Sequence, residues 1–364
     1  MKIHQPDYFF ISAIFALIIF GLVALASASV VISQENFGES YYYLKHQLIY
    51  GLAIGLVGFL VCQKIDYRFW KKIALPLLIL SLILLAAVFL PGMGHESNEA
   101  KRWVNIGPIS FQPFEFVKLS FILYLSAILS RAGERKKNLK ESLIPFAVVF
   151  VIISILVFFQ PNTSALFMAF LIAGIIYFLA ELSPVYLASA GVLAILCFFV
   201  LIKTASYRMG RLMVYLHPEM DPQGIGYQIN QALLAIGSGG LFGLGLGHSI
   251  QKWKYLPEII GDSIFAIIAE EFGFIGAGFL VFLFVFLAWR GLRIAKNAPD
   301  KFGYLLAGGI IGWLFFQAFI NMAAICGLVP LTGLPLPFVS YGGTALVVAM
   351  AAAGIIVNIS KQTK

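Results

Sequence analysis

The sequence predicts an all-α fold, a polytopic integral membrane bundle of about ten transmembrane helices. Of the 364 residues, 60% are hydrophobic and only 12% are charged, whereas soluble domains carry about 25% charged residues. Mean hydropathy is +0.92. So few polar residues cannot cover a water-exposed globule, which excludes the soluble and disordered classes.

Apolar runs recur along the whole chain, and each approaches the roughly 17 to 25 residues that a helix needs to cross a bilayer. None alternates with a period of two, which excludes a β-barrel. The ten runs lie near residues 8–30, 47–63, 73–90, 113–130, 143–159, 163–181, 184–203, 263–289, 302–325 and 338–358.

We expect both termini in the cytoplasm, because most Lys and Arg residues then fall on the inner side, as the positive-inside rule requires. This distribution accounts for the net charge of +8 without a nucleic-acid partner. The first run begins after Lys2 like a signal peptide, but it is longer than the usual 7 to 15 residues, so we expect an uncleaved anchor. The chain is predicted to form one transmembrane domain, 1–364, with a large extracytoplasmic loop near 204–262.

The first polar cluster lies in and before the fourth run, in the sequence AKRWVNIGPISFQPFEFVKL. Glu115 and Lys118 are three residues apart on a helix and can form a neutral pair near the outer interface. Alternatively, Arg102 and Lys118 face an anionic group, because a guanidinium and an ammonium together suit a pyrophosphate. Lys101 is a further cation of this cluster.

The second cluster lies at the outer entrance of the eighth run. Asp262 is either an N-cap, which accepts backbone N–H bonds, or a functional carboxylate. Glu270 and Glu271 follow within the same run. Two adjacent carboxylates in a span cannot both face lipid, so at least one must point into protein, paired or protonated.

The glycine-rich stretch before this run fits neither of the common phosphate-binding patterns. We expect a loop with a short interfacial helix, 226–236, anchored by Trp253 and Tyr255. His217 and His248 lack the spacing of a zinc site.

The third cluster is GLVPLTGLPLPFVSYGGTAL, residues 327–346, which includes Ser340. Its prolines and glycines interrupt helix geometry at the outer edge of the bundle. Irregular backbone at membrane depth is tolerated where it lines a cavity, so this segment is predicted to form a fixed entrance.

These three clusters, in this order, resemble the SEDS family of bacterial cell-wall proteins, typified by FtsW and RodA. The resemblance covers essentially the whole chain and is carried by KRWVNIGPISFQPFEFVKL, PEIIGDSIFAIIAEEFG and GLPLPFVSYGGTAL. Residues 228–258 look more like the division protein FtsW than the elongation protein RodA. Two positions depart from the family pattern: Phe114 stands where Ser is usual, and Asn162 where Asp is usual.

The resemblance implies a peptidoglycan glycosyltransferase of the bacterial cytoplasmic membrane, acting on its outer face. It would polymerise lipid II, the undecaprenyl-pyrophosphate-linked disaccharide peptide, during septal cell-wall synthesis. The implied partners are a class B penicillin-binding protein transpeptidase and other divisome proteins. The sequence predicts no metal site of its own; whether a divalent cation, Mg²⁺ or Mn²⁺, binds together with the substrate phosphates stays open from sequence alone.

In this interpretation, Asp262 is the general base that takes the proton of the acceptor sugar hydroxyl, with inversion at the donor carbon. Arg102 and Lys118, with Lys101 nearby, bind the pyrophosphate and stabilise it as it leaves. Glu115 orients Lys118 or helps to hold a cation. The secondary candidates are Glu270, Glu271 and Ser340.

Three alternatives stay open from sequence alone. A lipid II flippase would use the same cations, with Glu270 and Glu271 relaying protons. A RodA-like polymerase would catalyse the same glycosyl transfer during cell elongation instead of cell division. A non-catalytic scaffold would need Asp262 only as a helix cap.

Overall fold

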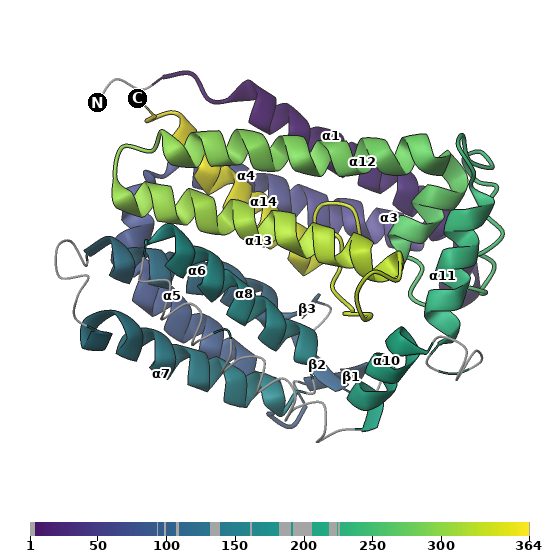
Figure 1. Cartoon of the computed structure of the whole chain (residues 1–364), viewed down its shortest axis with the longest axis horizontal. Coiled ribbons are helices and arrows are strands. Elements are labelled where there is room, and N and C mark those ends of the chain that lie inside the picture. The colour runs from purple at the N-terminus through teal and green to yellow at the C-terminus, as the bar shows by residue number, and fades with distance from the viewer. Residues whose placement is uncertain are drawn as a thin grey trace.

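The computed structural model describes residues 4–92, 94–97, 100–106, 109–131, 139–160, 162–181, 191, 206–217, 224 and 226–363. Within these ranges the molecule is a bundle of long helices that lie roughly along one axis (Figure 1). Seven helical segments are long and apolar enough to cross a membrane, and two shorter apolar stretches, Phe146–Phe158 and Thr163–Leu179, lie beside them. Nine of the ten predicted spans are therefore helical, and the tenth, 184–203, lies outside the described residues.

The first part of the chain forms two antiparallel spans and a third that follows. Asp7 caps the first helix by accepting a hydrogen bond from Phe10 N, 3.0 Å away. The second span passes from α-helix through a π-helical stretch and back without a break in the helix. The elements are α1 (Tyr8–Ala28), α2 (Val30–Phe37), α3 (Tyr42–His46), η1 (Gln47–Ala53), α4 (Ile54–Lys64) and α5 (Tyr67–Ala87).

A small antiparallel sheet precedes the fourth span, and it is the one departure from the all-helical prediction in the described residues. Its strands are β1 (Gly94–Ser97), β2 (Ala100–Ile106) and β3 (Ile109–Phe111), in the order β1-β2-β3. Val104 pairs with Phe111, and Trp103 with His95. β-Branched and aromatic residues favour strands, but this stretch is too short to give a strong sequence signal.

The remaining helices complete the bundle. They are α6 (Pro113–Arg131), α7 (Leu139–Phe158), α8 (Thr163–Leu179), α10 (Ser206–Leu216), α11 (Tyr227–Ser238), α12 (Ile264–Lys296), α13 (Lys301–Ile325) and α14 (Gly343–Ser360). The interfacial helix predicted at 226–236 is α11. Helix α12 is broken at Gly273, whose φ of 66° and ψ of −167° are not helical.

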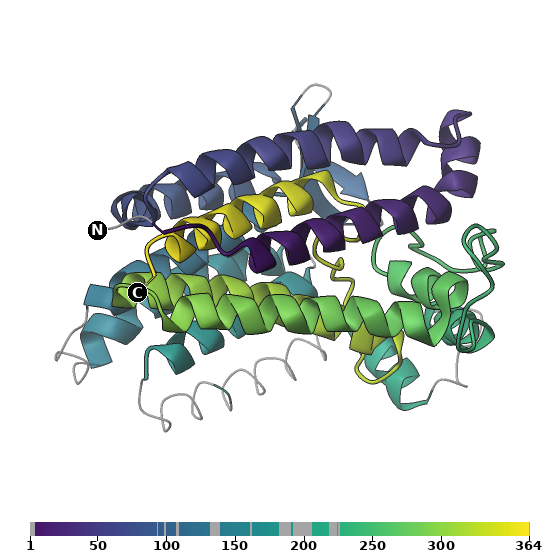
Figure 2. The same cartoon turned by 90° about the horizontal axis from the view of Figure 1, so that it is seen from above.

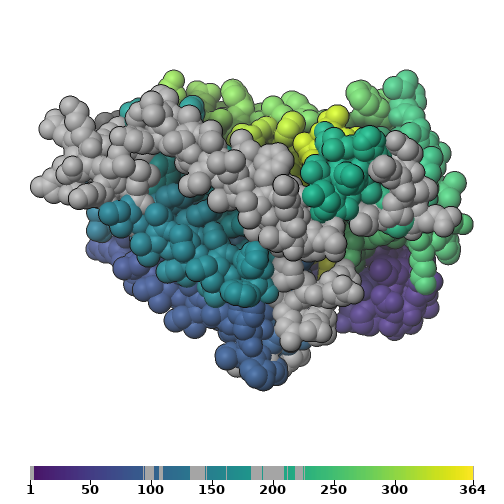
Figure 3. Space-filling model, turned by 60° about the horizontal axis from the view of Figure 1, so that its bottom comes forward, coloured from purple at the N-terminus to yellow at the C-terminus, as the bar shows by residue number. Residues whose placement is uncertain are grey.

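Three helices form the centre of the bundle. In α6, α13 and α14, 72 to 78% of the span is buried, against 22% in α5. The surface of α5 therefore lies at the periphery, where its blue atoms adjoin the teal atoms of α7 (Figure 3). Most side chains of α6, α13 and α14 are accordingly inside the protein.

The two termini lie together at one end of the bundle, whereas α10 and α11 lie at the opposite end (Figures 1 and 2). His4 N donates to Lys361 O at 2.8 Å, and Arg290 forms an ion pair with Asp7 at 2.5 Å. This arrangement confirms that both termini share one side, which the distribution of basic residues makes the cytoplasmic side. Strand β2, which carries the first polar cluster, and helices α10 and α11 lie away from this end (Figure 1).

Candidate active site

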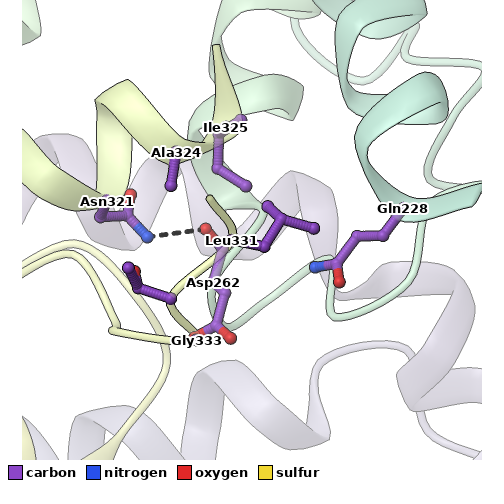
Figure 4. Close-up of a pocket in the computed structure, with 8 residues that line it drawn as sticks. Gln228, Asp262, Asn321, Ala324, Ile325, Leu331 and Gly333 are labelled. Atoms are coloured by element: carbon purple, nitrogen blue, oxygen red, sulfur yellow. Dashed lines mark hydrogen bonds between the residues drawn. The ribbon is translucent and has the colours of Figure 1, made fainter. Parts of the chain in front are cut away.

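Asp262 lies directly before α12, at the wall of a small pocket (Figure 4). The N-cap position of α12 is Ser263, one residue after Asp262. Its carboxylate points toward Gly333, where an added Cβ would lie 3.3 Å from Asp262 Oδ2. Gln228 of α11 and Asn321 of α13 line the same pocket.

The backbone around Asp262 is held by side chains from three other segments. Asn321 Nδ2 donates to Asp262 O at 2.8 Å, as Figure 4 shows. Ser340 Oγ donates to Gly261 O at 2.7 Å, and the Gln228 amide donates to Ser263 Oγ at 3.0 Å. Ser340, a secondary candidate from sequence, thus positions the segment that carries the carboxylate.

The pocket is small in this conformation. Its volume is about 20 Å³, enough for a water molecule but far below the few hundred Å³ of a typical ligand site. Leu331, Thr332 and Gly333 form one wall, and Ser164 of α8 donates a hydrogen bond to Thr332 O. Asp262 is itself half-buried and Gly333 is exposed, so the carboxylate lies near the surface of the protein.

The predicted pair of Glu115 and Lys118 is present, and it is buried inside the bundle. The Lys118 Nζ to Glu115 Oε2 distance is 2.8 Å, and both side chains are almost fully buried. Lys118 Nζ also donates to Gln317 Oε1 at 2.9 Å and lies 4.9 Å from the centre of the Trp313 ring. The Lys118 side chain does not extend toward the membrane surface, because its ammonium group is paired within the protein.

The other cations of the first cluster lie on strand β2. The guanidinium of Arg102 is half-buried and donates from Nε to Gln160 O at 3.5 Å. The side chain of Lys101 lies outside the described residues. The residues that line the Asp262 pocket include neither Arg102 nor Lys118. The pyrophosphate role of these cations stays a prediction.

Glu270 and Glu271 are both buried and both point into protein, as the sequence required of at least one of them. Glu271 Oε1 accepts from Ser27 Oγ at 2.6 Å and forms an ion pair with Lys252 Nζ at 3.2 Å. Glu270 accepts from Ser249 Oγ at 2.5 Å and from Ile250 N at 2.9 Å. Together they fasten the outer loop to α1 and α12.

The glycine-rich stretch has a structural role in this loop. Leu244 N and Gly245 N donate to Glu270 O and Glu271 O at 2.9 and 3.0 Å. These bonds satisfy carbonyl groups left open by the break at Gly273. An added Cβ at Gly243 would lie 2.1 Å from Glu271 O, so this close approach requires glycine.

The two departures from the family pattern have ordinary structural roles here. Phe114 is buried in the core. Asn162 Oδ1 accepts from Ala165 N at 3.1 Å and caps α8. An amide oxygen performs this capping as a carboxylate would.

Sequence analysis missed Gln228, Gln317 and Asn321. For Gln317 and Asn321 the available signal was their position within an apolar run, since uncharged polar residues there must find partners in the protein. Gln228 lies in the predicted loop and carried no such signal. Among the described residues, no three His, Cys, Asp or Glu side chains lie together in a way that could hold a metal ion.

Comparison with known proteins adds the following similarities. A family model described as "Cell cycle protein", of the FtsW, RodA and SpoVE type, matches residues 8–364. The chain is 39% identical to a probable peptidoglycan glycosyltransferase FtsW of Trichlorobacter lovleyi, over 100% of this chain and 95% of that protein. It is 36% identical to stage V sporulation protein E of Bacillus subtilis, over 100% of this chain and 99% of that protein.

Solved structures show the same arrangement of helices. A chain from a study of a peptidoglycan synthase complex, described as coordinating polymerization and crosslinking, has a TM-score of 0.80 at 27% identity, covering 98% of this chain and 97% of that one. The rod shape determining protein RodA of Thermus thermophilus has a TM-score of 0.71 at 26% identity, covering 98% of this chain and 97% of that one.

Proposed function

Because the chain belongs to the FtsW/RodA/SpoVE family of cell cycle proteins, we propose that it is a peptidoglycan glycosyltransferase that polymerises lipid II during cell division. The relatives named FtsW, at up to 39% identity along the whole chain, support the division branch. The RodA-like elongation role is the alternative within the same chemistry.

One observation carries the proposed mechanism: the Asp262 carboxylate points into a pocket, and side chains from three other segments hold residues 261–263 in place. As a general base it takes the proton of the acceptor's sugar hydroxyl. The freed oxygen attacks C1 of the donor sugar, and the bond from C1 to the pyrophosphate oxygen breaks with inversion. The leaving group is the lipid pyrophosphate, and Asp262 then returns its proton to water.

The leaving pyrophosphate needs positive charge where its own charge develops. Arg102 on β2 is the cation that we propose for this role, with Lys101 beside it. Lys118 is placed differently, since its ammonium already contacts Glu115 and Gln317 inside the bundle. Its direct contact with the pyrophosphate would require α6 and α13 to separate.

The proposal routes no step through a metal ion. A divalent cation would take most of its ligands from the substrate phosphates. Glu115, which sequence analysis offered as a ligand, is instead paired with Lys118.

We place the reaction on the outer face of the cytoplasmic membrane. The end of the bundle that carries Asp262 and the long loop is opposite to the termini and their basic loops. A transpeptidase of the class B penicillin-binding type is the proposed partner, since the product strand has to be crosslinked there. The similarity to a chain of a peptidoglycan synthase complex supports this pairing.

A flippase is the competing function. It would need Glu270 and Glu271 to exchange protons along a path through the membrane, whereas both are fastened to the outer loop by Ser249 and Lys252. The test is to incubate purified protein and its transpeptidase partner with lipid II and to measure glycan polymer. Polymer formation supports the proposal. Absence of polymer, with lipid translocation in vesicles, would establish the flippase instead.

A further inference from the structure

Helix α13 carries a buried row of three side chains with polar atoms, Trp313, Gln317 and Asn321, which we call the α13 row. The residues are four apart and so lie on one face of the helix. Their exposed fractions are 1%, 2% and 2%. Buried amides in an apolar span are costly unless they are hydrogen-bonded, so the partners of this row indicate what it does.

Gln317 joins the first polar cluster to the third. Its Oε1 accepts from Lys118 Nζ at 2.9 Å and from Trp313 Nε1 at 2.7 Å. Its Nε2 donates to Pro335 O at 2.8 Å. The Glu115–Lys118 pair is thus connected to the irregular segment that follows α13.

Asn321 joins the third cluster to the second. Its Nδ2 donates to Leu334 O at 2.6 Å and to Asp262 O at 2.8 Å. Gln317 and Asn321 therefore hold two successive carbonyl groups of one loop, those of Leu334 and Pro335. The preceding residue, Gly333, is the one that faces the Asp262 carboxylate.

We propose that Gln317 and Asn321 are positioning residues for the reaction. They set the 333–335 backbone against Asp262, so that the place of the carboxylate in the pocket depends on the buried Glu115–Lys118 pair. Lys118 then acts on the reaction through Gln317 and not only through contact with substrate. This inference rests on the proposed function.

Two substitutions test it while keeping side-chain size. Gln317→Glu keeps the oxygen that accepts from Lys118 and Trp313 and removes the donation to Pro335 O. Asn321→Asp removes the two donations from Nδ2. The matched control is Asn358→Asp, because Asn358 is also buried and donates to a backbone carbonyl, Gln63 O at 3.0 Å, at the cytoplasmic end of the bundle.

The first readout is polymerisation of lipid II by each variant with the transpeptidase partner. A displacement of about 1 Å at a reacting group costs on the order of 10²-fold in rate, so kcat of Gln317→Glu and Asn321→Asp should fall by about that factor with KM little changed. The control should keep wild-type kcat per folded molecule. Wild-type kcat in both test variants, or an equal loss in the control, overturns the inference.

The second readout is hydrogen exchange of the 331–340 backbone. Both test variants should exchange faster there than wild type, and the control should not. If the wild-type protein makes no polymer, the proposed function fails, and exchange alone decides the positioning claim: unchanged exchange in both test variants overturns it.

Discussion

Replacing Gly243 by alanine tests whether the outer loop holds the broken helix α12 in place. The φ of Gly243 is 82°, and an added Cβ would lie 2.1 Å from Glu271 O and 2.6 Å from Gly273 N. Both contacts are with backbone atoms, so the loop or the helix must shift. The matched control is Gly247→Ala, because Gly247 has a φ of 84° and nothing within 4 Å of its added Cβ.

The size of the effect follows from these contacts. Both alanines cost about 1 to 2 kcal/mol, because L-residues disfavour positive φ. Gly243→Ala should also weaken the bonds from Leu244 N and Gly245 N to the α12 carbonyls, which contribute about 1 kcal/mol each, and it adds overpacking of about 1 to 3 kcal/mol. The expected difference between the variants is about 3 to 5 kcal/mol of folding free energy.

Thermal unfolding of the purified protein in detergent measures this difference. Gly243→Ala should unfold several degrees below Gly247→Ala. It should also polymerise lipid II more slowly, because the displaced helix segment begins next to Asp262. Equal unfolding temperatures for the two variants would refute the role that we assign to this contact.

Three further predictions concern single substitutions, and the first two have a matched control variant. Gly333→Ala should reduce polymerisation more than Gly327→Ala, because both have positive φ but only the first places a methyl group 3.3 Å from the pocket carboxylate; equal activities would contradict this. Lys252→Met leaves a buried carboxylate unpaired and should lower stability by about 3 to 5 kcal/mol in unfolding assays. Lys254→Met, at an exposed ion pair, should cost about 0 to 1 kcal/mol, and similar losses at the two positions would argue against the buried pair. Asp300→Asn should lower the unfolding temperature at neutral pH, but the difference from wild type should shrink as pH falls through the acid range. Burial raises the pKa of this carboxyl, yet hydrogen bonds from a tyrosine and a backbone N–H together with a nearby arginine outweigh it and hold the pKa below its ordinary value. The stabilisation is therefore lost on protonation, and a difference that does not depend on pH would contradict it.

Most of the helical bundle was predictable, because length and hydropathy alone identify a membrane span. The break at Gly273 was not, since it depends on a loop some thirty residues earlier in the chain, where Gly243 fits against the helix. The small sheet was missed because its strands are only 3 to 7 residues long. Local sequence patterns do not reveal contacts between distant residues, such as that of Gly243 with the break in α12.

The candidate site was predictable where charge marked it. Asp262 and the Glu115–Lys118 pair stood out because ionisable residues are rare in this chain. Gln317 and Asn321 did not, since an amide in an apolar run looks neutral and its partners are distant in sequence. Gln317 is 199 residues from Lys118, and Asn321 is 59 residues from Asp262.

The central claim is that the Asp262 carboxylate takes the proton from the acceptor hydroxyl. The most direct measurement compares kcat for lipid II polymerisation by wild type and Asp262→Asn, since asparagine keeps the shape of the side chain and removes the base. A positioned base contributes about 10² to 10⁴-fold, so we expect at least a hundredfold loss in a folded variant that still associates with its transpeptidase. An Asn variant that polymerises within a few-fold of the wild-type rate would contradict the account.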